Sequence, residues 1–219
     1  MSTSVSLGEI VERETAGFVC LDSHQIEAVE RHYELLLRWN RRMNLTTVTK
    51  LPEAAIRHYC ESLFLAARLT AGRVVDVGSG AGFPGIPVAI ARPECFVDLV
   101  ESHQRKAVFL REASRGMGNV GVIGARAESL LPPGRSASRP SARELEYASE
   151  LGPLYDWMVS RAVNPAELMR LPLARRYALL IGGDDLAVLR PEEVTPLPWG
   201  SQRVLAIGTF HVKRAALND

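Results

Sequence analysis

An apolar run, a glycine-rich turn and a second apolar run follow one another in residues 74–91, VVDVGSGAGFPGIPVAIA. The β-branched residues at 74–77 predict a buried strand, which ends abruptly at Gly78. Residues 84–91 then predict a helix, because a proline is tolerated in a first helical turn, where its missing N–H has no partner within the helix. A glycine turn between a strand and a helix allows the main chain to approach a ligand closely.

The rest of the chain repeats this alternation of strands and helices. We expect a strand at 95–101, a helix at 105–115, and strands at 120–123, 155–160 and 177–181. Strands separated by helices predict a parallel, doubly wound sheet. The last strand, 204–212, follows several prolines and no further helix, so we expect it to be an antiparallel edge strand.

Two helices are expected before the first strand. Residues 21–42 have a helical apolar period, and Asp22 with Gln25 three residues later predicts a capping box at the helix start. A second helix is expected at 52–69. The sequence therefore predicts an N-terminal helical extension, residues 1–70, and a core, residues 71–219, within one compact domain.

The composition is typical of a globular protein, with 47% hydrophobic and 23% charged residues. The formal net charge of +1 neither requires nor excludes a nucleic-acid partner. No apolar run approaches the length of a membrane span, so we expect a cytoplasmic protein without a membrane partner.

Cys20, Cys60 and Cys95 form no CxxC pair, which predicts reduced core thiols and no metal site. Residues 132–150, rich in Ser, Pro and Arg, predict a surface loop.

Two ligands are compatible with the glycine turn. The residues from Gly80 to Gly85 satisfy the GxGxxG dinucleotide pattern, and Glu101, at the end of the next strand, would bind a ribose in either case. Asp76 separates the two interpretations. A pyrophosphate requires a helix N-terminus without opposing negative charge, whereas the ammonium and sulfonium of S-adenosylmethionine are favoured by an acid. A methyltransferase is therefore the preferred interpretation, and an NAD(P)-binding oxidoreductase is the alternative.

Several further blocks carry a resemblance to a known family. They are Arg38-Trp39-Asn40 with Asn44-Leu45-Thr46, Arg57-His58 with Glu61-Ser62, the run from Asp76 to Ile90, Glu101 with Arg105-Lys106 and Phe109-Leu110, Arg126-Ala127-Glu128, and Ser160-Arg161-Ala162. With these blocks, residues 21–181 resemble the RsmG (GidB) family of bacterial methyltransferases, which modify N7 of a guanosine in 16S ribosomal RNA. The resemblance implies a class I methyltransferase fold, Rossmann-like and α/β, with a doubly wound, mostly parallel seven-stranded sheet.

The resemblance also implies where S-adenosylmethionine binds. Gly78 and Phe83 would line the site, Glu101 would hold the ribose, Ala127 and Glu128 would flank the adenine, and Arg161 would lie at the edge. The full expected set is Asp76, Gly78, Gly80, Gly82, Phe83, Glu101, Ser102, Ala127, Glu128 and Arg161. Simpler roles stay open for three of them: Phe83 in core packing, Glu128 beside a helix N-terminus, and Arg161 as a solvated surface charge.

No catalytic acid or base is expected, because guanine N7 has a lone pair and no proton, and the enzyme chiefly has to align the reactants. The expected RNA-binding residues are basic or polar: Arg38, Arg41, Arg42, Asn44, Arg57, His58, Arg105 and Lys106. Phosphate contacts from such groups position RNA without reading its sequence. The alternative is a solvated helix face. For Trp39, packing against the sheet is preferred over base stacking.

The chain departs from the family pattern after the predicted strand at 177–181. Relatives typically have a lysine before a glycine there, whereas this chain has Ile181-Gly182-Gly183-Asp184-Asp185. Two acids near RNA weaken phosphate binding, which leaves open a non-catalytic RNA-binding or ribosome-binding relative. The expected partner is 16S ribosomal RNA in the small ribosomal subunit, bound by a monomer.

Overall fold

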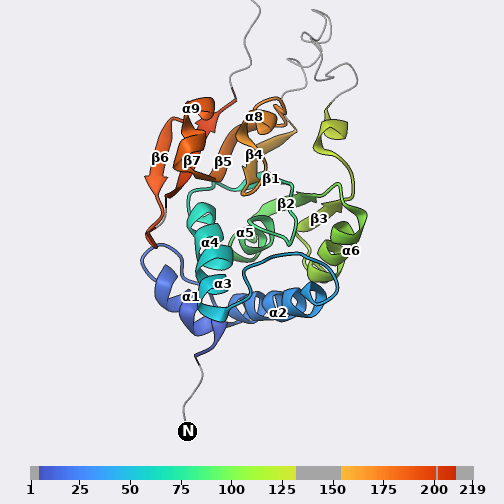
Figure 1. Cartoon of the computed structure of the whole chain (residues 1–219), viewed down its shortest axis with the longest axis vertical. Helices are drawn as coiled ribbons and strands as arrows, with labels where there is room; N and C mark the ends of the chain where they lie inside the picture. The colour runs from blue at the N-terminus through green and yellow to red at the C-terminus, as the bar shows by residue number, and fades with distance from the viewer. Residues whose placement is uncertain (1–4, 132–153, 201, 211–219) are drawn as a thin grey trace, which may run out of the picture.

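The computed structural model describes residues 5–131, 154–200 and 202–210. A seven-stranded sheet forms the middle layer of the described part (Figure 1). Its strands are β1 (Gly72–Val77), β2 (Cys95–Val100), β3 (Val120–Ile123), β4 (Tyr155–Ser160), β5 (Ala174–Gly182), β6 (Glu193–Pro196) and β7 (Arg203–Thr209). They lie in the order β3-β2-β1-β4-β5-β7-β6. Strands β1 to β5 are parallel, and β7 runs antiparallel to both β5 and β6.

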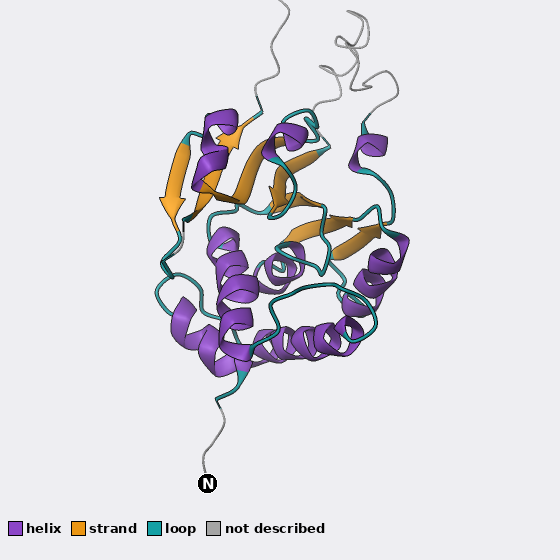
Figure 2. Ribbon diagram, in the orientation of Figure 1, coloured by secondary structure: helices purple, strands orange, loops and turns teal. Residues whose placement is uncertain are grey.

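Helices cover both faces of this sheet (Figure 2). On one side lie α1 (Leu7–Thr15), α2 (Ser23–Asn40), α3 (Leu51–Ala54), the π-helix η1 (Ala55–Cys60), α4 (Glu61–Ala66), α5 (Gly85–Ala91) and α6 (Gln104–Ala113). Among the described residues, the other side carries short helices, which are η2 (Ala127–Leu130), α8 (Pro165–Leu168) and α9 (Leu186–Leu189), with η3 (Gly183–Asp185) before α9.

Alternate residues of the central strands point into two separate cores. Val74 and Trp157 point into the core beneath α1 to α6, whereas Val75 and Met158 point into the core beneath the short helices. All four side chains are at most 1% exposed. A strand buried on both faces needs an almost continuous apolar sequence, which explains why the valine run before Gly78 predicts β1.

The helix predicted at residues 21–42 is confirmed as α2, together with its capping box. The main-chain N–H of Gln25 donates to Asp22 Oδ1 and that of Asp22 donates to Gln25 Oε1, both at 2.9 Å, which completes the capping box of α2. The second predicted helix is a continuous helical stretch, residues 51–66, with a π-helical turn in its middle. Such π-turns are rare and occur frequently at functional sites.

Several details differ from the predictions. The last strand is antiparallel as expected, but the edge of the sheet is β6, which the sequence analysis treated as a proline-broken segment. Pro196 is compatible with β6 because an edge strand has N–H positions that need no partner. The helix α1 was not predicted, and Cys20 is exposed rather than in the core. The loop expected at 132–150 lies outside the described residues.

Candidate active site

The turn after β1, residues 78–82, is called the glycine loop below. Gly78, Gly80 and Gly82 have φ angles of 72°, 57° and 88°, a region that side chains disfavour. A Cβ built on Gly80 meets only the carbonyl oxygen of Gly78, at 3.8 Å, so the space in front of Gly80 is open. A Cβ on Gly78 would collide with Val163. The loop therefore offers bare main chain at Gly80, and Gly78 lies directly against the segment that follows β4.

The parallel strands bring four of the predicted segments to one edge of the sheet. Val77, Val100 and Ile123, the last residues of β1, β2 and β3, are paired in register. On the other side of β1, the hydroxyl of Ser160 at the end of β4 donates to the carbonyl of Val77 at 2.8 Å. The order of strands reverses between β1 and β4, and open α/β sheets bind ligands outside the carboxyl ends of strands at such a switch point.

Glu101 ties the glycine loop to the end of β2. Its Oε2 accepts from the main-chain N–H of Gly80 at 3.0 Å, and its Oε1 accepts from that of His103 at 2.7 Å. Its side chain is buried beside the open space at Gly80. Each carboxylate oxygen has a further lone pair, so the group can also accept from two hydroxyls of a ribose.

Asp76 lies beneath the loop, where it is fully buried. Its Oδ2 accepts from the N–H of Gly85 at 3.0 Å, so the carboxylate occupies the N-terminus of α5, whereas Oδ1 has no hydrogen-bond partner within the described structure. Burial raises the pKa of Asp76 to about 7. A pyrophosphate at this helix start would face that carboxylate directly. The position therefore supports the argument against a dinucleotide, but the buried Asp76 has no exposed surface for direct contact with a ligand.

The ring of Phe83 packs below the loop. The ring is 3% exposed and stacks on the ring of His58, with the two ring centroids 4.6 Å apart. The guanidinium of Arg161 lies over it, 4.9 Å from the Phe83 ring centroid. Contact with a cofactor stays a prediction for Phe83, and core packing accounts for its ring. Arg161 is not a solvated surface charge, because its Nη1 also donates to the carbonyl of Arg57 at 2.8 Å.

A residue that the sequence analysis missed supports the loop from α2. His32 is buried, with Nε2 3.1 Å from the carbonyl of Ala81 and Nδ1 2.9 Å from the hydroxyl of Tyr59. Burial lowers the pKa of His32 to about 4, so the ring is neutral near pH 7. The carbonyl can only accept, which places the proton on Nε2 and makes the tyrosine hydroxyl the donor to Nδ1. The position of this histidine within the apolar stripe of α2 was the available signal.

Three other predicted cofactor residues lie after β2 and β3. Ser102 is exposed, Ala127 is 8% exposed at the start of η2, and Glu128 is exposed in the first turn of η2. The position of Glu128 suits an acid at a helix N-terminus, so this simpler role and adenine contact both stay open.

A pocket of about 390 Å³, called the inner pocket below, opens beside Arg161. It is lined by Asn44, Leu45, Thr46, Thr47, Val48, Arg57, His58, Glu61, Arg161, Ala162 and Arg203. The inner pocket thus brings together Asn44, Arg57 and His58, which were predicted to bind RNA, with Arg161, which was predicted to bind the cofactor. Arg203 carried no sequence signal, because it comes from β7, far along the chain. Glu61 was noted only as part of a resembling block.

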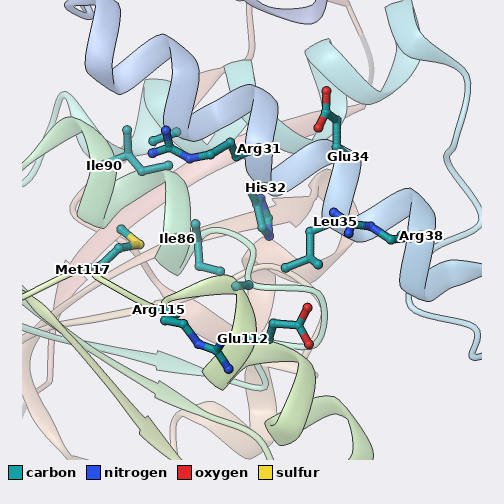
Figure 3. Close-up of a pocket in the computed structure, with 12 residues that line it drawn as sticks. Arg31, His32, Glu34, Leu35, Arg38, Ile86, Ile90, Glu112, Arg115 and Met117 are labelled. Carbon is teal, nitrogen blue, oxygen red and sulfur yellow. The ribbon is translucent and has the colours of Figure 1, made fainter.

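Arg38 lies elsewhere, in a groove of about 400 Å³ between α2, α5 and α6 (Figure 3). Arg31, Glu34, Glu112 and Arg115 also line this groove, so its charges are mixed. Neither pocket is lined by the remaining predicted RNA-binding residues, which are Arg41, Arg42, Arg105 and Lys106. Lys106 is half-buried, and the three arginines are exposed. Trp39 packs edge-on against Phe109 of α6, with centroids 5.8 Å apart, so it packs against a helix rather than the sheet.

The strand order, the antiparallel β7 and the glycine loop after β1 define the class I methyltransferase fold. The family model for GidB, described as rRNA small subunit methyltransferase G, matches residues 25–173. The chain belongs to this family.

Curated relatives agree with this assignment. Ribosomal RNA small subunit methyltransferase G of Xanthomonas campestris pv. campestris (strain B100) is 36% identical over 185 residues, 82% of this chain and 77% of the relative. The protein of the same name from Xylella fastidiosa (strain M23) is 46% identical over 112 residues, 50% of this chain. That match spans only about half, 53%, of the length of the Xylella relative.

Solved structures resemble the chain more distantly. A predicted O-methyltransferase from Agrobacterium tumefaciens is 21% identical with a TM-score of 0.49, covering 68% of this chain and 79% of that one. Aeropyrum pernix fibrillarin, solved with S-adenosyl-L-methionine, is 12% identical with a TM-score of 0.47, covering 69% and 74%.

Proposed function

We propose that the protein transfers a methyl group from S-adenosylmethionine to N7 of a guanosine in 16S ribosomal RNA. Two observations support this proposal. The chain belongs to the family described as rRNA small subunit methyltransferase G, and it has an open glycine loop at the switch point of its sheet. The substrate would be the small ribosomal subunit or a precursor of it, met in the cytoplasm by a monomer.

The residues around the loop fit the methyl donor. The open space at Gly80 accepts a ligand against bare main chain, and Glu101 beside it offers acceptors for ribose hydroxyls. The buried Asp76 beneath the loop favours a positive charge above it. When bound, the donor supplies a methyl group on a positively charged sulfur. Ser102, Ala127 and Glu128 are proposed to border its adenine side.

The acceptor base is proposed to enter the inner pocket. This pocket adjoins the glycine loop, because Arg161 lies over Phe83 and Val163 lies against Gly78. N7 of guanine carries a lone pair and no proton, so the chain has only to hold the base in line and exclude water. Neutral His58 and the basic Arg57 and Arg161 line the pocket, and Nδ1 of His58 faces Arg161 rather than a carboxylate, which suits a reaction that needs no general base.

Four basic residues outside the inner pocket, Arg41, Arg42, Arg105 and Lys106, are proposed to contact RNA phosphates. Arg41 and Arg42 are exposed in the turn after α2, which leads directly to Asn44 at the pocket wall. Arg105 and Lys106 lie in the first turn of α6, close along the chain to Glu101. The acids that replace the family lysine lie in η3, after Gly182, and would weaken phosphate contacts at that place. An NAD(P)-dependent reaction is not favoured, because the Asp76 carboxylate occupies the start of α5.

The test is methyl transfer to small-subunit particles that lack the modification. Incubation with labelled S-adenosylmethionine, followed by digestion and nucleoside mass spectrometry, is expected to give N7-methylguanosine at one position. Particles shown to be competent with another methyltransferase, yet unlabelled by this protein, would contradict the proposal. Tight particle binding without labelling would instead indicate a non-catalytic relative.

A further inference from the structure

The inner wall of the inner pocket contains a charge pair that is not satisfied. Glu61 in α4 is 3% exposed, and its Oε2 lies 3.2 Å from Nε of Arg203 in β7. The two groups form an ion pair, but its geometry does not meet that of a hydrogen bond. Glu61 Oε2 and both Nε and Nη2 of Arg203 have no hydrogen-bond partner in the part of the chain described here.

Buried polar atoms without partners are uncommon in folded proteins, since each has lost its hydrogen bonds to water. Here three such atoms lie together on two residues that line a pocket. Burial raises the pKa of Glu61, while the charge of Arg203, and then those of Arg161 and Arg57, lower it. The arrangement is therefore a guanidinium donor beside a carboxyl acceptor. It suits a ligand that has a hydrogen-bond acceptor next to hydrogen-bond donors.

The pocket wall is also reachable from a second side. A further pocket of about 500 Å³, called the outer pocket, shares Arg57, Glu61 and Arg203 with the inner one and extends to Trp199. The charge pair thus lines both spaces, so an unstacked base that enters either one would meet it. Single-stranded RNA is commonly recognised by hydrogen bonds to the Watson–Crick edges of unstacked bases.

Among the four RNA bases, only guanine presents an acceptor followed by two donors on that edge, namely O6, N1–H and the N2 amino group. Adenine and cytosine present a donor first, and uracil ends in an acceptor that a carboxylate would repel. An arginine beside a carboxylate offers a donor followed by two acceptors. This order complements guanine and conflicts with the other three bases.

We propose that Glu61 and Arg203 select the target base by its Watson–Crick edge, an inference that rests on the proposed function and adds a recognition site to it. Glu61 accepts from N1–H and the N2 amino group, and Arg203 donates to O6. N7 belongs to the opposite edge of the base, so it stays free for methyl transfer. Both residues determine specificity and take no part in moving the methyl group.

The test replaces the target guanosine by inosine, which keeps N7, O6 and N1–H but lacks the N2 amino group. Once the methylated position has been mapped, particles are rebuilt with rRNA ligated to carry guanosine or inosine there. The wild-type protein is expected to have a kcat/KM about tenfold or more lower on inosine, the effect of removing one hydrogen bond to a charged group. Glu61→Gln is expected to lower the guanosine value toward the inosine value, so that their ratio approaches one.

Two comparisons make the result decisive. Glu94→Gln, which alters an exposed glutamate paired with Arg92, is expected to keep the wild-type ratio, and donor affinity by calorimetry is expected to be unchanged in Glu61→Gln. A wild-type protein that methylates inosine as well as guanosine overturns the inference even if the variant does not fold. An unchanged ratio in folded Glu61→Gln overturns it too. In both cases the proposed function survives, whereas absence of any guanosine labelling removes both.

Discussion

Nη1 of Arg161 donates to Nδ1 of His58 over 3.0 Å, and this contact joins the end of β4 to the helical part of the chain. Burial, and then the charge of Arg161, lower the pKa of His58 to about 3. The ring is therefore neutral, with its proton on Nε2, which lies 3.1 Å from the carbonyl of Val48 and 3.0 Å from Oγ1 of Thr46. One histidine thus holds two walls of the inner pocket in position.

His58→Ala should loosen both walls. We expect methyl transfer to ribosomal particles to fall about a hundredfold, because a small misplacement of reacting groups is enough for such a loss. Donor affinity should change much less, since the Glu101–Gly80 contact is not touched. Single-turnover rates and calorimetry measure the two effects. Replacement of the exposed His24 in α2 by Ala is the control, and equal losses in both variants would contradict the positioning role.

Gly80→Ala tests the open face of the glycine loop. The substitution places a methyl group in the ligand space at a positive φ, which adds about 1–2 kcal/mol of strain. Gly116→Ala is a matched control, because Gly116 also has a positive φ of 86° and open space around it but lies after α6. Urea unfolding should show a similar loss of stability in both variants. Only Gly80→Ala should abolish S-adenosylmethionine binding, and equal binding by both would refute the proposed donor site.

Donor affinity should depend on the ionisation of Asp76. With a pKa of about 7, this carboxyl group becomes charged as the pH rises through neutrality, and a cation above the loop favours the charged form. Arg161 and Glu101 are the other charges that act on it. Calorimetry from about pH 6 to about pH 8 should show affinity for S-adenosylmethionine increasing more steeply with pH in the wild type than in Asp76→Asn. Parallel curves would mean that Asp76 does not act on the donor.

Stability toward acid should depend on His32. Its folded pKa of about 4 lies below the ordinary 6.5, so the folded state resists protonation. The stabilisation is complete above pH 6.5 and is lost as the pH falls toward 4. His32→Gln removes this titration, and its unfolding free energy should fall less than that of the wild type between about pH 7 and about pH 5. Urea unfolding at both values provides the measurement, and equal losses would contradict it.

Arg41 and Arg42 should contribute to RNA binding through charge alone. Replacing both with Ala is expected to weaken particle binding and to reduce the slope of log affinity against log salt by about 0.7–0.9 for each phosphate that is no longer neutralised. Arg13→Ala, at a residue paired with Glu14 in α1, should leave the slope unchanged. Filter binding at several salt concentrations would reveal an unaltered slope if the two arginines are only solvated.

Local sequence determined the strands other than β6, the capping box of α2 and the glycine loop. Each of these depends on neighbouring residues: an apolar run, a side chain three positions away, or a φ that only glycine readily adopts. Glu101 could be predicted as well, since the end of a parallel strand fixes its place. The edge strand β6 was missed because its pairing partner, rather than its own composition, makes it a strand.

Tertiary structure alone decided how the inner pocket is built. Glu61 and Arg203 meet because α4 covers the part of the sheet to which β7 returns, and nothing near either residue in the sequence indicates this. The same holds for His32 under Ala81 and for the burial of Asp76, which the sequence predicted only as one of the cofactor-binding residues. Contacts between distant segments depend on packing, and a sequence pattern carries only the local part of that information.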